Sequence, residues 1–168
     1  MNAEQSYLKL LDILRKRKDA GNVFELAGLA MGGAWIAQRL AIDLKLSHFG
    51  VINVAFHRDD YAEKGMTALR TASTMTTHLP FEVNGANVIL IDDVLFTGRT
   101  VRAALNELFD FGRPAQVELM VLADRENREL PISADFVGEQ VSIPESQTLV
   151  LEKDDAGKFS FQLEEHEE

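Results

Sequence analysis

Helix-like and strand-like hydrophobic patterns alternate along the first three quarters of the chain. Three segments carry apolar residues three and four positions apart, which predicts helices at 3–18, 34–46 and 99–111. Four shorter and nearly continuous apolar runs predict buried strands at 23–29, 49–56, 87–92 and 117–123. Strands that alternate with helices are typical of an α/β domain, with a mainly parallel central sheet flanked by helices.

The remaining segments have weaker patterns. Residues 58–85 are mostly polar, which predicts a long surface loop or a loosely ordered hairpin. Short strand-like segments follow at 134–137, 148–151 and 159–163, and the chain ends in an acidic tail at 164–168. Because no repeat or linker interrupts the sequence, we expect one domain over residues 1–168.

Composition restricts the partners of the protein. The 168 residues are 46% hydrophobic and include no cysteine, which excludes disulfides and thiolate metal sites and fits the cytoplasm, where we expect the protein. The first residues do not resemble a secretory signal, and no apolar run approaches the roughly 20 residues of a membrane span, so we expect no membrane partner. A net charge of −10 disfavours general nucleic-acid binding, although it does not exclude a local basic patch.

An acid pair and a glycine turn follow the run at 87–92. Asp92 and Asp93 stand at the expected carboxyl end of that strand, where open α/β sheets bind ligands. Thr97-Gly98-Arg99-Thr100 then opens a helix, and the free backbone N–H groups of a helix N-terminus form an anion site. One ligand could therefore present hydroxyls to the acids and a phosphate to the turn, which indicates a ribose 5-phosphate group.

Other interpretations of the acid pair stay open at this point. Two acids at a strand end also occur as a solvated sheet edge, a helix cap, a phosphoacceptor site or a metal site. The turn lacks the Gly-Lys-Ser/Thr of a Walker A loop, so it does not indicate that class of nucleotide site. The acids, their spacing and the glycine turn together favour the sugar phosphate.

The segment Asp92-Asp93-Val94-Leu95-Phe96-Thr97-Gly98-Arg99-Thr100 resembles the phosphoribosyl pyrophosphate (PRPP) signature of type I phosphoribosyltransferases. Four further segments, 112–114, 121–125, 128–132 and 134–138, are similar to the pyrimidine operon regulators of the PyrR family, which are also uracil phosphoribosyltransferases. Residues 58–60 resemble the Tyr-Arg-Asp-Asp segment of that family. The resemblance spans about residues 27–151 and implies a type I phosphoribosyltransferase fold, with a small hood at about 133–152.

The resemblance implies a reaction and a role for each motif. Uracil and PRPP would give UMP and pyrophosphate, with Mg²⁺ carried on the pyrophosphate and no metal site built from protein groups alone. Asp92 and Asp93 would hold the ribose hydroxyls and favour the positive charge that develops as pyrophosphate leaves. The 5-phosphate would lie among Val94, Leu95, Phe96, Thr97, Gly98, Arg99 and Thr100. The resemblance also implies a homodimer or a larger even assembly.

Other residues of the site come from separate segments. Arg70 matches a loop, at about 58–85, that closes over PRPP and excludes water, and Arg125 matches an arginine that contacts the nucleotide. The backbone of Leu149 would recognise uracil. Without the family match, Arg70 is also compatible with an exposed loop arginine, and Arg125 is also compatible with a surface ion pair. We expect the side chains of Trp35 and Phe136 in the core, and those of His57 and His78 at the surface.

Two features depart from the family. The pyrophosphate turn usually carries a basic residue and a threonine, but here it contains Met31, Gly32 and Gly33. Losing one charge-assisted contact costs about 1.5–3 kcal/mol, or roughly tenfold to a hundredfold in affinity or rate, so a weak enzyme or a nucleotide sensor is an alternative. The acidic charge also places the second alternative, an RNA-binding attenuator switched by UMP, below the transferase.

Overall fold

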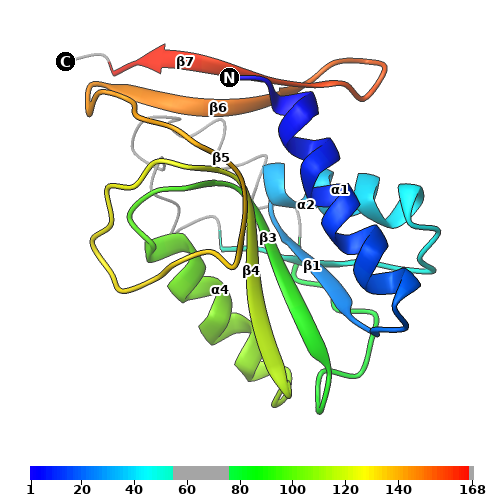
Figure 1. The fold of residues 1–168 in the computed structure, drawn as a ribbon. Helices are drawn as coiled ribbons and strands as arrows, with labels where there is room; N and C mark the ends of the chain where they lie inside the picture. The colour runs from blue at the N-terminus through cyan, green and yellow to red at the C-terminus, as the bar shows by residue number, and fades with distance from the viewer. Residues whose placement is uncertain (55–75, 167–168) are drawn as a thin grey trace.

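The central element of the fold is a five-stranded parallel sheet, which confirms the predicted α/β class. The computed structural model describes residues 1–54 and 76–166. The strand order is β2-β1-β3-β4-β5 (Figure 1). The strands are β1 (Glu25–Leu29), β2 (Gly50–Ile52), β3 (Asn87–Leu95), β4 (Gln116–Asp124) and β5 (Phe136–Gln140).

Helices cover both faces of this sheet. They are α1 (Ala3–Asp19), α2 (Gly32–Asp43) and α4 (Arg99–Asp110). Figure 1 shows α1 and α2 on one face and α4 on the other. In the described ranges, no helix combines the length and the apolar composition that crossing a bilayer requires.

The continuous apolar run of β3 follows from burial on both faces. Ile89 and Ile91 pack in the core beneath α1 and α2, whereas Val88 and Leu90 pack in the core beneath α4. Successive side chains of a strand point to opposite faces, so a strand covered on both sides needs apolar residues at every position. The sequence pattern therefore predicted correctly that β3 is a buried parallel strand, and the structure makes it the middle strand of the sheet.

A separate antiparallel hairpin packs above the carboxyl end of the sheet. It consists of β6 (Gln147–Lys153) and β7 (Phe159–Glu165). Residues 136–140, which belong to the expected hood at 133–152, form β5 and pair with β4 at the edge of the main sheet. Asp135 explains this placement, because it donates its backbone N–H to the Leu119 carbonyl and accepts the Leu119 N–H on its carboxylate, both at 2.8 Å. Strand β7 also takes the first two residues, 164 and 165, of the predicted acidic tail.

The end of the predicted loop at 58–85 is attached to the sheet. His78 exchanges two backbone hydrogen bonds with Val51 of β2, at 2.8 and 2.9 Å, and its side chain is exposed as expected. The hydroxyl of Thr77 accepts the backbone N–H of Asn53 at 3.0 Å. Residues 76–85 therefore form an ordered return to β3. Arg70 and His57 lie outside the described residues.

A polar brace joins the hairpin to the helices. Glu4 accepts two hydrogen bonds from Arg39, at 2.6 and 2.9 Å, and one from the backbone N–H of Phe159 at 2.9 Å. The bonds from Arg39 lower the pKa of the Glu4 carboxyl. The Arg39 guanidinium lies 3.9 Å from the ring centroid of Tyr7, whose hydroxyl donates to Asp43 at 2.5 Å. Helices α1 and α2 and strand β7 thus meet at one cluster.

Replacing Tyr7 with alanine should strongly destabilise the protein. Tyr7 is fully buried, lies edge-on to Phe159 and supports Arg39, so its loss leaves a cavity and breaks the brace. We expect Tyr7→Ala to lower the free energy of unfolding by about 3–5 kcal/mol in urea titration. Leu8→Ala is the matched control, since Leu8 is adjacent in α1 but 53% exposed, and it should cost less than about 1 kcal/mol. Equal losses for the two variants would contradict this account.

Candidate functional site

The acid pair lies inside β3 and is buried. The strand continues to Leu95 because its ladder with β4 persists past the acids, with Val94 opposite Ala123. Asp92 and Asp93 are only 3% and 7% exposed. Each carboxylate accepts the backbone N–H of the next residue, at 2.9 Å for Asp92 and 2.8 Å for Asp93. The interpretation of this pair as a solvated sheet edge is therefore wrong.

The glycine turn before α2 packs directly on Asp93. A Cβ atom added to Gly32 would lie 2.3 Å from Oδ2 of Asp93, and one added to Gly33 would lie 2.1 Å from the carbonyl oxygen of Ile91. Neither distance leaves room for a side chain, so both positions require glycine. The peptide bond between Ala30 and Met31, at the start of this turn, is cis. The structure therefore brings two motifs into one site, although Gly32 and Asp93 are 61 residues apart in the sequence.

The start of α2 provides the polar groups of this turn. Met31 is the N-cap residue of α2, and its side chain makes no capping hydrogen bond. The N-terminal N–H groups of a helix carry partial positive charge and attract anions. No charged side chain occurs at residues 30–33, so any anion held here would rely on backbone groups of this turn and on contributions from other segments.

The second turn, at residues 96–100, opens α4. Gly98 has a φ of +97°, a left-handed conformation that favours glycine, and α4 has no side-chain cap. Thr97 and Thr100 are buried, at 6% and 7% exposure, and Arg99 is exposed. The predicted phosphate-binding segment begins at Val94, two residues before this turn. Val94 and Leu95 belong to β3, and the Leu95 side chain lies in the core.

Arg128 holds this turn from behind, a role that its place in the sequence did not reveal. Its guanidinium donates to the carbonyl of Phe96 at 2.7 Å, to the carbonyl of Ile132 at 2.7 Å and to both carboxylate oxygens of Asp124 at 2.9 Å. Four bonds from one side chain thus connect the turn to the end of β4. The only signal in the sequence was its place in 128–132, one of the segments that carried the family resemblance.

Arg125 lies beside the same turn and is buried rather than exposed. It is 4% exposed, and its guanidinium lies 3.9 Å from the ring centroid of Phe96. Its backbone N–H donates to the carbonyl of Leu95 at 2.9 Å, and its side chain donates to the carbonyl of Pro144 at 3.4 Å. The interpretation of Arg125 as a surface ion pair is therefore wrong, and the residue forms part of the wall next to the turn.

The hairpin residue Leu149 packs its side chain into a small core. It is 4% exposed and clusters with Ala123, Val141 and Ile143. Val94, the residue after the acid pair, also packs against this core, so β6 lies at the carboxyl ends of β3 and β4. The expected role of Leu149 concerned its backbone and remains a prediction. The side chains of Trp35 and Phe136 are partly buried against the core beneath α1 and α2.

Comparisons with known proteins agree on one family. The phosphoribosyl transferase domain family matches residues 3–148. A relative named "Bifunctional protein PyrR" from Ralstonia nicotianae is 49% identical, over 98% of this chain and 95% of its own. A protein of the same name from Nitrosococcus oceani is 45% identical, over 82% of this chain and 77% of its own.

Solved structures support the same fold. A hypoxanthine-guanine phosphoribosyltransferase from Bacillus anthracis has a TM-score of 0.63 at 20% identity, covering 89% of this chain and 85% of its own. The hypoxanthine phosphoribosyltransferase of Trypanosoma cruzi has a TM-score of 0.60 at 17% identity, covering 96% and 93%. At such low identity these likenesses show the shared fold alone.

Replacing Arg128 with lysine should destabilise the turn that opens α4. Lysine keeps the charge, but its single ammonium group cannot reach the Phe96 and Ile132 carbonyls and both oxygens of Asp124 together. We expect Arg128→Lys to lower the free energy of unfolding by about 2–3 kcal/mol. Arg99→Lys is the control, because Arg99 and its partner Glu129 are more than half exposed, and it should cost about 1 kcal/mol or less. Losses of the same size in urea titration would contradict the role given to Arg128.

Proposed function

The chain belongs to the PyrR family of type I phosphoribosyltransferases, and on that basis we propose that it transfers ribose 5-phosphate from PRPP to uracil. The products are UMP and pyrophosphate. The observation that carries this proposal is the contact between the buried Asp93 carboxylate and the Gly32 backbone, close to the turn at 96–100. This arrangement offers carboxylates and two helix N-termini to one ligand that has hydroxyls between a phosphate end and a pyrophosphate end.

The acid pair acts on the ribose in this proposal. The bond between C1 of the ribose and pyrophosphate breaks, a bond from C1 to N1 of uracil forms, and the N1 proton passes to solvent. Positive charge develops on the ribose during this exchange, and the carboxylates of Asp92 and Asp93 stabilise it. Because both side chains are buried, water screens their charge less than it would at the surface.

The two turns act on the two phosphate ends of PRPP. The turn at 96–100 takes the 5-phosphate through backbone N–H groups and the hydroxyls of Thr97 and Thr100. The start of α2, at Met31, Gly32 and Gly33, takes the pyrophosphate through backbone groups. Arg125 contacts the nucleotide beside Phe96. Arg70, a residue outside the described ranges, covers the pyrophosphate. The backbone of Leu149 pairs with the imide edge of uracil.

The carboxylate oxygens of Asp92 and Asp93 suit Mg²⁺ that arrives bound to pyrophosphate. Magnesium prefers oxygen ligands and commonly takes one or two carboxylates together with substrate phosphates. Among the residues that the structure describes, no group of three His, Cys, Asp or Glu side chains could hold an ion without the substrate. When bound, Mg²⁺ neutralises charge on the leaving pyrophosphate.

The proposal is tested by synthesis of UMP. Purified protein is mixed with labelled uracil, PRPP and Mg²⁺, and the formation of labelled UMP and pyrophosphate is followed over time. Orotate and purine bases in place of uracil are the specificity controls. The transferase proposal is overturned if well-folded protein forms no UMP above a no-enzyme control. If calorimetry then shows that the same protein binds UMP, the nucleotide-sensor alternative is supported instead.

Replacing Gly32 with alanine should damage catalysis more than stability. The added Cβ meets the Asp93 carboxylate at 2.3 Å, so the carboxylate or the turn must move. We expect Gly32→Ala to lower kcat/KM for uracil and PRPP by at least about a hundredfold, about 2.7 kcal/mol, and to leave a cooperative unfolding transition. Met31→Ala changes the neighbouring residue without a clash and should lower kcat/KM less than about threefold. A Gly32→Ala enzyme with unchanged kcat/KM would contradict the coupling of the turn to Asp93.

A regulatory role is the second candidate function, because the curated relatives are named bifunctional. In this role UMP binding would switch the affinity of the protein for a pyrimidine-operon leader RNA. The basic run at the end of α1 offers little to RNA, since Lys16 pairs with Asp12, Arg17 pairs with Glu118 and Lys18 donates to the Leu44 carbonyl. Together with the net charge of −10, this ranks the regulator second.

The regulatory role predicts UMP-dependent binding to the leader RNA. A gel shift at low salt, with and without UMP, measures it, and a scrambled RNA of equal length is the control. Binding should weaken steeply between 50 and 200 mM salt if phosphate contacts carry it, roughly a thousandfold for six or more such contacts. The absence of a shift at low salt would remove this candidate and leave the transferase untouched.

A further inference from the structure

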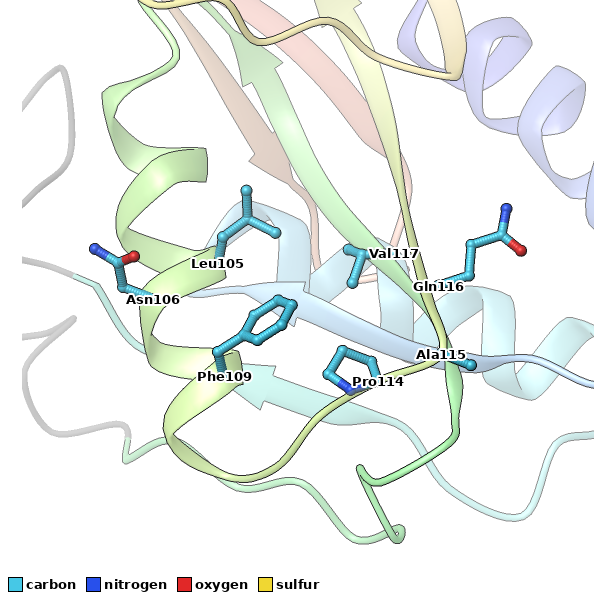
Figure 2. A pocket seen from close by; sticks show the side chains of 7 residues that line it. All are labelled: Leu105, Asn106, Phe109, Pro114, Ala115, Gln116 and Val117. Atoms are coloured by element: carbon cyan, nitrogen blue, oxygen red, sulfur yellow. The ribbon is translucent and has the colours of Figure 1, made fainter.

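Two hollows of similar volume lie on the described surface, and they differ in charge. The first, of about 470 Å³, lies between α4 and the start of β4, and Figure 2 shows Leu105, Phe109, Pro114 and Val117 around it. The second, of about 490 Å³, lies between α2 and the turn that joins β6 to β7. No charged side chain lines the first hollow, whereas four charged side chains line the second. We call the second hollow the α2 pocket.

The floor of the α2 pocket is the polar brace between the helices and the hairpin. Glu4 is the only acid among the residues that line the pocket. Its carboxylate accepts two hydrogen bonds from Arg39 and one from the backbone N–H of Phe159. Nε of Arg39 also lies 3.9 Å from the carboxylate of Asp43. The positive charge of Arg39 is therefore balanced within the fold, and so is the negative charge of Glu4.

Two lysines of the hairpin are the remaining cations of the pocket. Lys153 pairs with Phe159 in the last rung of the β6–β7 ladder, and Lys158 directly precedes Phe159. Within residues 1–54 and 76–166, neither lysine forms an ion pair. Nζ of Lys153 lies 5.1 Å from the ring centroid of Trp35, a contact that leaves donors of the ammonium group for another partner. Both lysines can therefore bind an anion.

The turn between these lysines is ordered by Asp154. Its carboxylate accepts the backbone N–H groups of Ala156 and Lys158, both at 2.9 Å, and its own N–H donates to the Lys158 carbonyl at 3.1 Å. The Asp154 side chain thus bonds within its own turn and does not line the pocket. The fold therefore fixes the backbone positions from which both lysine side chains reach the pocket.

The wall that α2 contributes offers apolar surface beside these charges. Trp35, Gln38 and Ile42 follow at spacings of three and four, which places them along one side of the helix. Trp35 is partly buried against the core, and Ile42 is 68% exposed, which is high for a large apolar side chain. Small-molecule sites commonly have volumes of roughly 300–1,000 Å³ and combine apolar walls with a few polar groups. The α2 pocket has this size and this combination.

We propose that the α2 pocket binds a small organic anion that carries an aromatic ring, such as a nucleoside monophosphate. The ring packs against Ile42 and the accessible part of Trp35, and the ammonium groups of Lys153 and Lys158 hold the anionic group through charge-assisted hydrogen bonds. This site is separate from the proposed substrate site, because neither the acid pair nor the two turns beside it contribute to the lining of the pocket.

A small anion fits the α2 pocket better than a polyanion does. Binding of RNA depends on many phosphate contacts along an extended surface, and two lysines provide few of them. The net charge of −10 also repels a long polyanion over the surface around the pocket. A small molecule enters the hollow itself and meets the two lysines at hydrogen-bonding distance, where the charges of the outer surface are largely screened.

The fluorescence of Trp35 tests the proposal directly, because Trp35 is the only tryptophan of the chain. The protein is titrated with AMP, with adenosine, which keeps the base without the charge, and with ribose 5-phosphate, which keeps the charge without the base. We expect a saturable change with AMP, and dissociation constants at least tenfold higher for the other two probes. The absence of a saturable change with AMP, or equally tight binding of adenosine, would overturn the proposal.

Substitutions separate the α2 pocket from the rest of the molecule. The double variant Lys153→Gln and Lys158→Gln should raise the dissociation constant of AMP at least tenfold. Lys9→Gln with Lys16→Gln removes the same charge from exposed positions of α1 and should change that constant less than about twofold. Circular dichroism establishes that each variant is folded. Equal effects of the two lysine pairs would overturn the proposal.

A variant of the proposed phosphate turn identifies where AMP binds. Thr100→Val removes a hydroxyl from the turn at 96–100 and should leave the dissociation constant of AMP within about twofold. If Thr100→Val weakens AMP binding as much as the hairpin double variant is expected to, and the hairpin variant does not weaken it, AMP occupies the substrate site and the proposal is overturned. Since neither PRPP nor uracil is present, the result does not depend on whether the protein makes UMP.

Discussion

The contact between the Asp93 carboxylate and the Gly32 backbone is the constraint on which the site depends. Strand β3 brings the carboxylate to a position where no side chain fits opposite it, so the turn before α2 has to be glycine there. That contact fixes where α2 starts and therefore where its positive end points. Helix α2 in turn carries Arg39, which joins the brace with Glu4 and Phe159 and so positions the hairpin of β6 and β7. The acid, the helix terminus and the hairpin are thus set by one close approach.

Two turns with different construction share this site. The turn at 96–100 is held from behind by Arg128, which bonds the Phe96 carbonyl, and by the backbone N–H groups of Glu129 and Leu130, which donate to the Thr97 carbonyl. The turn at 30–33 has tight packing but no charged side chain. A rigid and polar turn binds an anion well with little reorganisation, whereas the second turn needs charge from elsewhere. Under the proposed function, this difference favours firm holding of the 5-phosphate end over the pyrophosphate end.

Local patterns in the sequence predicted most of the fold, and contacts between distant segments account for what they missed. The helices of residues 3–19 and 99–110 and the strand of β3 were predicted because apolar spacing records burial directly. The pairing of β5 with β4 was not predicted, because it depends on the paired bonds of Asp135 with Leu119. The roles of Arg128 and of Asp93 against Gly32 were also missed. Both depend on atoms brought together by the sheet, and such pairs leave no periodic signal in one sequence.

The acidic charge of the chain and its expected anionic ligands are compatible because they act over different distances. At physiological ionic strength charges more than about 8 Å apart are largely screened, so most of the net charge of −10 is not felt inside the site. The N–H groups at the starts of α2 and α4 and the buried guanidinium of Arg125 act at hydrogen-bonding distance, in surroundings that screen them less. The outer surface then slows the approach of a polyanion without preventing its binding.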